Sequence, residues 1–347
     1  MTDLQVFWFV ALGLLLTGYA ILDGFDLGVG TLHLFAKSEF ARGSDEHGER
    51  RVLLNSIGPL WDGNEVWLVT FGGALFAAFP RAYATALSGF YLPFMLLLVT
   101  LIGRAVAIEF RSKRPERWWR AYWDFSFSAA SSLVTFIAGV AVGNAIRGIP
   151  IDAEGEYAGT LTTLINPYAI AVGAFAVVTS AMHGSVYLAL KTEGDLRRRV
   201  TGWMWTSFGL FLVGYIGVTM LTLVSVPRAL DNFERWPAAW VLVALNVLAI
   251  ANIPRAIHLG RAGYAFVSSS ATIASLVFLF GMAMFPNLLH STPVPEHSLS
   301  IYNASSSEKT LRLMRVVAFI GVPLILTYTT TVYWIFRGKT RLDDSSY

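Results

Sequence analysis

The chain has 347 residues, of which 55% are hydrophobic and only 14% are charged, and its formal net charge is +3 at neutral pH. This balance is far more apolar than that of soluble domains and predicts an integral membrane protein. The sequence contains no cysteine, which excludes disulfides, thiolate metal sites and iron–sulfur clusters. It also shows no phosphate-cradling loop, zinc-type His-Glu spacing or nucleophile elbow, so we expect no nucleotide-driven or hydrolytic chemistry.

Long apolar runs recur along the chain, each close to the roughly 20 residues that a helix needs to cross a bilayer. They predict an all-α polytopic fold in a single integral membrane domain, residues 1–347. About nine transmembrane helices are expected, over residues 5–27, 53–78, 82–110, 120–146, 166–190, 200–224, 238–258, 263–285 and 311–336. We expect two four-helix bundles plus one peripheral helix. Asp3 replaces the positive start of a signal peptide, so the first segment is expected to remain as a helix.

Basic residues are unevenly distributed between the two sets of loops that nine helices define. Eighteen Lys and Arg residues fall in one set and seven in the other, and Arg104 inside a segment completes the total of 26. Because cytoplasmic loops retain positive charge, the N-terminus is predicted outside and the C-terminus in the cytoplasm. The positive charge therefore reflects membrane topology, and no nucleic-acid partner is expected.

Two acidic residues lie in the first predicted helix. Asp23 and Asp26 are three residues apart and therefore share one helix face. With the N-terminus outside, they lie in the cytoplasmic part of this segment. Acidic side chains inside membrane segments are costly and usually mark proton or ion paths, although a purely structural role stays open.

Two further acidic residues lie in the second predicted helix. Asp62 is about 14 Å from its cytoplasmic start, and Glu65 is about 4–5 Å deeper. The four carboxylates would therefore form a series that descends from the cytoplasm towards the middle of the membrane. Trp61, directly before Asp62, is expected to serve in packing or at the interface.

Arg104 is the lone cation well inside a predicted helix. An unpaired charge there would be expensive, so the sequence predicts a carboxylate partner, with Asp23, Asp62 and Glu109 as candidates. A structural ion pair and electrostatic tuning of a proton path are both open. Asp124, near the start of the fourth helix, is expected to be an ordinary interfacial charge or a charge at the helix N-terminus.

The six histidines offer no facing pair of haem ligands. Only His183 falls near the middle of a segment, while His33, His47 and His258 lie towards the cytoplasm. His290 and His297 fall in an outer loop. The chain is therefore expected to bind no haem or metal by itself.

The sequence resembles subunit II of the cytochrome bd-type quinol oxidases over nearly its whole length. The resemblance rests on residues 23–30, 55–68, 76–80, 89–91, 104, 110–113, 284–286 and 302–306. The long motif that contains Trp61-Asp62-Gly63-Asn64 is the most specific of these.

The resemblance implies a two-bundle, nine-helix subunit that forms a heterodimer with a haem-bearing subunit I in the bacterial inner membrane. Subunit I would carry two b-type haems and haem d, oxidise quinol and reduce O2 to water with cytoplasmic protons. Subunit II would carry no haem, supply part of the proton path and stabilise its partner. A structural quinone in subunit II and a small single-helix accessory subunit are left open.

By motif position, Asp23, Asp26 and Asp62 carry over as proton-path residues, with Trp61 and Arg104 as supporting neighbours. Glu65 is a weaker match, since the family admits an amide there. Two other readings remain: a proton-coupled secondary transporter that uses the same acids, and an inert scaffold in which every buried acid is only ion-paired. Discontinuous helices in paired halves would favour the transporter.

Overall fold

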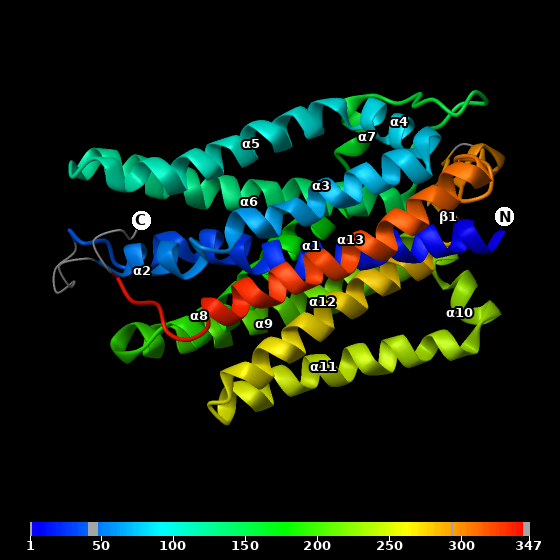
Figure 1. Ribbon diagram of the computed structural model, residues 1–347. Helices are drawn as coiled ribbons and strands as arrows, with labels where there is room; N and C mark the ends of the chain where they lie inside the picture. The colour runs from blue at the N-terminus through cyan, green and yellow to red at the C-terminus, as the bar shows by residue number, and fades with distance from the viewer. Residues whose placement is uncertain (1, 41–47, 293, 343–347) are drawn as a thin grey trace.

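The protein is described by a computed structural model that covers residues 2–40, 48–292 and 294–342. Its elements run side by side along one direction, with the two termini at opposite ends (Figure 1). We call the end at which α1 and α13 finish the C-terminal end. The helices are α1 (Thr2–Leu32), α2 (Gly48–Ile57), α3 (Trp61–Ala78), α4 (Pro80–Gly89), α5 (Tyr91–Phe110), α6 (Arg117–Arg147), α7 (Leu161–Leu164), α8 (Pro167–Lys191), α9 (Gly194–Ser225), α10 (Asp231–Arg235), α11 (Trp240–His258), α12 (Ala262–Met284) and α13 (Glu308–Ile335).

The predicted all-helical membrane fold is confirmed. Among the described residues, eight helices are long and apolar enough to cross a membrane: α1, α5, α6, α8, α9, α11, α12 and α13. The count of nine is therefore approximate. The remaining predicted segment contains α3, whose first turn is polar, and α3 packs lengthwise against α1 and also against α13.

Two segments predicted as continuous helices are broken. Residues 53–78 divide into α2 and α3 around Pro59, and residues 82–110 divide into α4 and α5 at Phe90. Pro59 has no N–H to donate to Asn55, and proline disfavours helical geometry in the residue before it. Pro93, in the first turn of α5, likewise cannot bond back to Gly89.

The helices form two groups of four. Helices α1, α3, α5 and α6 make the first group, α8, α9, α11 and α12 make the second, and α13 lies outside both against α3 and α1. The groups meet where α8 packs against both α6 and α1. On α1, Gly28 faces Ser180 and Gly184. A Cβ added to Gly28 would lie 1.9 Å from the Ser180 carbonyl oxygen, so this close approach requires glycine.

A small cap closes the N-terminal end of the bundle. Its strands β1 (Asn287–Leu289) and β2 (Leu299–Ser300) pair antiparallel. Gln5 donates to Ser305 at 2.8 Å, and the Trp8 indole donates to the Leu311 carbonyl at 3.1 Å. These bonds tie the start of α1 to the connection that precedes α13 and to the first turn of α13.

Candidate functional site

A cluster of charged side chains lies inside the first helix group. Arg104 of α5 is fully buried, and its Nη2 lies 3.3 Å from Oδ1 of Asp23, which is also fully buried. Its Nη1 contacts Glu65 of α3, whose side chain is 24% exposed. The guanidinium group therefore joins a carboxylate in the protein interior to one that reaches the protein surface.

The partners of Arg104 match the sequence-based expectation in part. Asp23 was one of three candidates, whereas Glu65 was not considered. Asp62 and Glu109 are both exposed on the surface of the chain rather than paired with Arg104. The Trp61 ring lies 6.0 Å from the Arg104 guanidinium carbon, so Trp61 borders the cluster as a cation–π neighbour.

Asp26 lies one turn further along α1 and has a different set of contacts. Asn64 of α3 donates to Asp26 Oδ2 at 2.7 Å and to the Leu22 carbonyl at 3.2 Å. The Tyr333 hydroxyl of α13 donates to Asn64 Oδ1 at 2.9 Å. Sequence reasoning missed Asn64 and Tyr333. Asn64 lies between Asp62 and Glu65 in the long motif of residues 55–68. That position was the one sequence signal that could have identified Asn64.

Several polar atoms in this region have no hydrogen-bond partner among the described residues. They are both oxygens of Asp23, Oδ1 of Asp26, Nε and Nη2 of Arg104 and the hydroxyl of Tyr19. Asp23 Oδ1 and Arg104 Nη2 contact each other in their mutual ion pair at 3.3 Å. Tyr19, Asp23 and Asp26 follow one another on a single face of α1 at spacings of four and three residues. Because buried polar atoms are almost always hydrogen-bonded, we expect this face to be hydrated.

Asp62 was a candidate partner of Arg104, and the structure does not pair them. It lies in the first turn of α3 and is exposed on the surface of this chain. The physical reason is helix phase: Asn64 takes the inward position next to Asp26, and Asp62 is about 200° away around the helix. Asp62 therefore lies on the outer surface of the chain, near the depth of the charge cluster.

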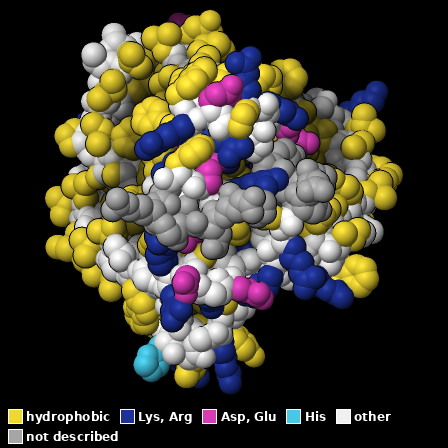
Figure 2. All heavy atoms as spheres, turned by 90° about the vertical axis from the view of Figure 1, so that its left-hand side faces the viewer, with side chains coloured by type: hydrophobic (Ala, Val, Ile, Leu, Met, Phe, Trp, Pro, Cys, Tyr) yellow, Lys and Arg dark blue, Asp and Glu magenta, His cyan; other side chains and the backbone are white. Residues whose placement is uncertain are grey.

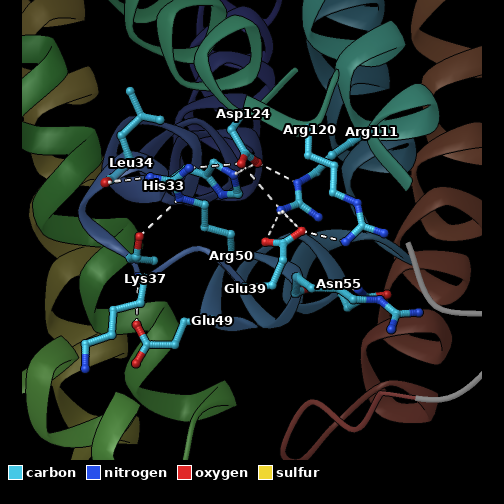
Figure 3. Close-up of polar contacts among 12 residues, drawn as sticks. His33, Leu34, Lys37, Glu39, Glu49, Arg50, Asn55, Arg111, Arg120 and Asp124 are labelled. Atoms are coloured by element: carbon cyan, nitrogen blue, oxygen red, sulfur yellow. Dashed lines mark hydrogen bonds and ion pairs between the residues drawn. The ribbon is translucent and has the colours of Figure 1, made fainter. Parts of the chain in front are cut away.

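Asp124 also differs from the expected ordinary interfacial charge. It is buried and accepts hydrogen bonds from three side chains (Figure 3). His33 Nε2 lies 2.6 Å from its Oδ1, Arg111 Nε donates to the same oxygen at 2.5 Å, and Arg50 Nη1 donates to Oδ2 at 3.0 Å. This network joins α2, α6 and the turns that follow α1 and α5.

Glu39 extends the same network towards the surface of the C-terminal end. Its carboxylate pairs with Arg111 at 3.1 Å and with Arg120 at 2.7 Å. Burial alone would raise the pKa of Glu39, but the two guanidinium groups hold the pKa below its ordinary value. Figure 2 shows basic side chains gathered with acidic ones on this end of the molecule.

The histidine in the middle of a segment is engaged on both ring nitrogens. His183 Nδ1 lies 2.7 Å from the Ser269 hydroxyl, and Nε2 lies 3.1 Å from the Ile21 carbonyl. The ring stacks on Phe266. His183 thus joins α8 to α1 and α12 as a packed core residue. Within the described ranges, no group of three or more His, Asp or Glu side chains is placed to hold a metal ion.

An apolar cavity of about 480 Å³ lies between the two helix groups. Side chains of α1, α6, α8, α9 and α12 contribute to its wall, including Leu16, Phe175 and Phe280. Tyr19 also lines it, so the cavity adjoins the face of α1 that carries Asp23 and Asp26. Its size and apolar wall suit part of a hydrophobic ligand.

These features define a polytopic helical membrane protein with a charge cluster in its interior. The chain belongs to the family of cytochrome bd terminal oxidase subunit II, which matches residues 4–336.

Individual relatives agree with this assignment. The chain is 35% identical over 373 residues to cytochrome bd-I ubiquinol oxidase subunit 2 of Escherichia coli strain K12, covering 98% of this chain and 96% of that protein. It is 34% identical over 344 residues to cytochrome bd ubiquinol oxidase subunit 2 of Bacillus subtilis strain 168, covering 98% and 97%. The chain is therefore a multi-pass membrane subunit of an oxidoreductase complex.

The fold matches a solved structure as well. A chain in the structure of bd oxidase from Geobacillus thermodenitrificans superimposes with a TM-score of 0.77 at 20% sequence identity, covering 97% of this chain and 99% of that one. At this identity the likeness supports the helical architecture alone.

Proposed function

We propose that this chain is the haem-free second subunit of a quinol oxidase in the aerobic respiratory chain. Its partner, subunit I, carries two b-type haems and haem d, oxidises quinol and reduces O2 to water. This chain supplies cytoplasmic protons to the partner and stabilises it in a heterodimer. Because the protons consumed come from the cytoplasm and quinol protons leave outside, a gradient forms without pumping.

The proton path is proposed to use Asp23, Asp26 and Asp62, with Arg104, Trp61 and Glu65 in support. The observation that carries this proposal is the continuous pairing from Asp23 through Arg104 to Glu65, from a buried carboxylate to one at the surface. Arg104 lowers the cost of a carboxylate in the membrane. Water on the α1 face would carry the proton between the acids.

The exposed position of Asp62 supports a partner on the α3 face. A carboxylate that faced hydrocarbon would be costly, so at this depth it is expected to face protein or a water-filled cavity. Subunit I supplies such a surface in our proposal. Asp62 then stands at the boundary between the subunits, where a proton leaves this chain. A small single-helix subunit would have to bind elsewhere.

The apolar cavity is proposed to hold the isoprenoid part of a structural quinone. Its volume of about 480 Å³ and its largely apolar wall support this assignment. Organic extraction of the purified oxidase followed by mass spectrometry tests it. Quinone retained after the substrate site is blocked, and lost when the cavity-lining Ala138 is replaced by Leu, is the expected result. Equal quinone content in both proteins contradicts it.

The chain is proposed to lie in the bacterial inner membrane with the C-terminal end of the bundle in the cytoplasm. The Lys and Arg asymmetry supports this orientation. It places the Asp124 network at the cytoplasmic surface and the β1–β2 cap outside.

The alternative of a proton-coupled transporter receives less support. The breaks near Pro59 and Phe90 both fall in the first half of the chain, whereas the long helices of the second half are continuous in the described residues. Paired breaks at the midplane are what such transporters show.

Purification of the chain in mild detergent, followed by an absorption spectrum, distinguishes the two functions. A co-purifying larger partner with b-type and d-type haem absorption is expected, and a colourless solitary protein contradicts the oxidase.

A further inference from the structure

Asn64 has an amide orientation that its neighbours determine. Its Nδ2 faces two acceptors, the Leu22 carbonyl and Asp26 Oδ2, while its Oδ1 faces the Tyr333 hydroxyl. A flipped amide would place its oxygen against two other oxygens, which is repulsive. The Tyr333 hydroxyl, a donor and acceptor, is the one neighbour that accommodates Oδ1.

This orientation makes the two oxygens of Asp26 unequal. Oδ2 accepts a hydrogen bond from Asn64 at 2.7 Å, whereas Oδ1 is buried and has no protein partner among the described residues. A carboxylate oxygen that already accepts from a fixed amide is a poor place for a proton. Oδ1 is therefore the atom of Asp26 that can exchange a proton with water.

Tyr333 lies on the peripheral helix α13, most of whose side chains are exposed. Its ring is half-buried and stands edge-on to Phe25 at a centroid distance of 6.4 Å. The hydroxyl thereby reaches α3 across the gap between the helices. By contrast, Tyr328 on the same helix is 61% exposed and forms no hydrogen bond through its hydroxyl among the described residues.

We propose that Tyr333 is a positioning residue for proton transfer at Asp26 and that it acts through Asn64. This inference rests on the proposed function, in which Asp26 belongs to the proton path. Tyr333 holds the amide, the amide occupies Oδ2, and proton exchange is confined to Oδ1. Without the tyrosine hydroxyl, Asn64 keeps its two acceptors but loses the partner of its oxygen, so the amide is held less firmly against Oδ2.

The experiment uses the whole oxidase with Tyr333→Phe and, as the matched control, Tyr328→Phe. We expect Tyr333→Phe to lower the maximal rate of O2 consumption by about 3- to 10-fold, the range that loss of one buried hydrogen bond gives. The haem spectrum and the KM for quinol should be unchanged, while the pH profile of the rate shifts. Tyr328→Phe should match the unsubstituted oxidase. Equal rates and pH profiles for all three proteins overturn the proposal.

A double-mutant comparison tests whether Tyr333 acts through Asn64. Asn64→Leu already removes the amide, so adding Tyr333→Phe should cause little further loss. Independent, multiplicative losses contradict the proposal. If Asn64→Leu fails to assemble, the pH profile of Tyr333→Phe alone tests the proposal: a shifted profile supports it, and an unchanged profile contradicts it.

Asp26→Asn separates this inference from the proposed function. A slow Asp26→Asn oxidase with a normal Tyr333→Phe oxidase overturns only the role of Tyr333. A normal Asp26→Asn oxidase overturns the path through Asp26 itself, and the role of Tyr333 with it.

Discussion

Arg104 Nη2 lies 3.3 Å from Asp23 Oδ1, and both side chains are fully buried. The two residues come from α5 and α1, which are far apart in sequence. This pair holds two helices of the first group together and sets a charge in the membrane interior. Removing one partner would leave a buried charge unpaired, which does not happen when a surface ion pair is broken.

Replacing Arg104 by Leu should strongly impair assembly of the subunit. Asp23 would lose its cation in a buried setting, and breaking such a pair costs about 3–5 kcal/mol. The yield of assembled oxidase and its melting temperature measure the effect. The double variant Arg104→Leu with Asp23→Leu should recover part of the loss, because Asp23 is then no longer a buried carboxylate without its cation. Arg114→Leu, at an exposed position, serves as the control.

Replacing Asp62 by Asn should slow O2 reduction while assembly persists. The side chain is exposed on this chain, so the substitution creates no cavity and leaves no buried charge unpaired. Loss of a proton-transferring group typically costs about 100-fold or more. Oxygen consumption per haem is the measurement, with Glu109→Gln as an exposed carboxylate control. Normal turnover of Asp62→Asn would rule out the relay through Asp62.

Replacing Asp124 by Asn should destabilise the C-terminal end of the bundle. An amide cannot accept from His33, Arg50 and Arg111 as a carboxylate does, and the buried Arg111 would lose its closest partner. We expect a loss of about 2–4 kcal/mol, seen as a lower melting temperature and faster proteolysis of this end. Asp195→Asn is the control, since its side chain is 85% exposed. Equal melting temperatures for the two variants would contradict a stabilising network.

The stability of the β1–β2 cap should fall as the pH drops from about 6.5 to about 4. Burial, with a smaller contribution from Arg228, lowers the pKa of His290 from its ordinary value of 6.5 to about 4. In this range the unfolded chain binds a proton at His290 and the folded chain does not, so acid favours unfolding. His290 contributes no such penalty above pH 6.5.

His290→Gln should therefore flatten the pH dependence of the melting temperature between these values. Hydrogen exchange of the cap at pH 5 and pH 7 gives a local readout of the same effect. His258→Gln, at an exposed position, should leave the pH dependence as it is. An unchanged slope in His290→Gln would show that other groups cause it.

The sequence by itself determined the membrane class, the approximate helix count and the family. These properties follow from local quantities: apolar runs of bilayer length, the distribution of Lys and Arg, and motifs such as residues 55–68. The positions of Asp23 and Asp26 on one helix face also follow from local periodicity. Even the breaks in two predicted helices have local causes in Pro59 and Pro93.

Only the tertiary structure decided which side chains meet. Asn64 and Tyr333 are 269 residues apart, and Arg104 selects Asp23 and Glu65 over Asp62 and Glu109. Helix periodicity places residues on faces but does not say which face turns towards which neighbour. That choice depends on the packing of all the helices together, including close contacts such as Gly28 against Ser180. This packing explains why Asp62 lies on the outer surface of the chain, whereas Asp124 lies at the centre of a buried network.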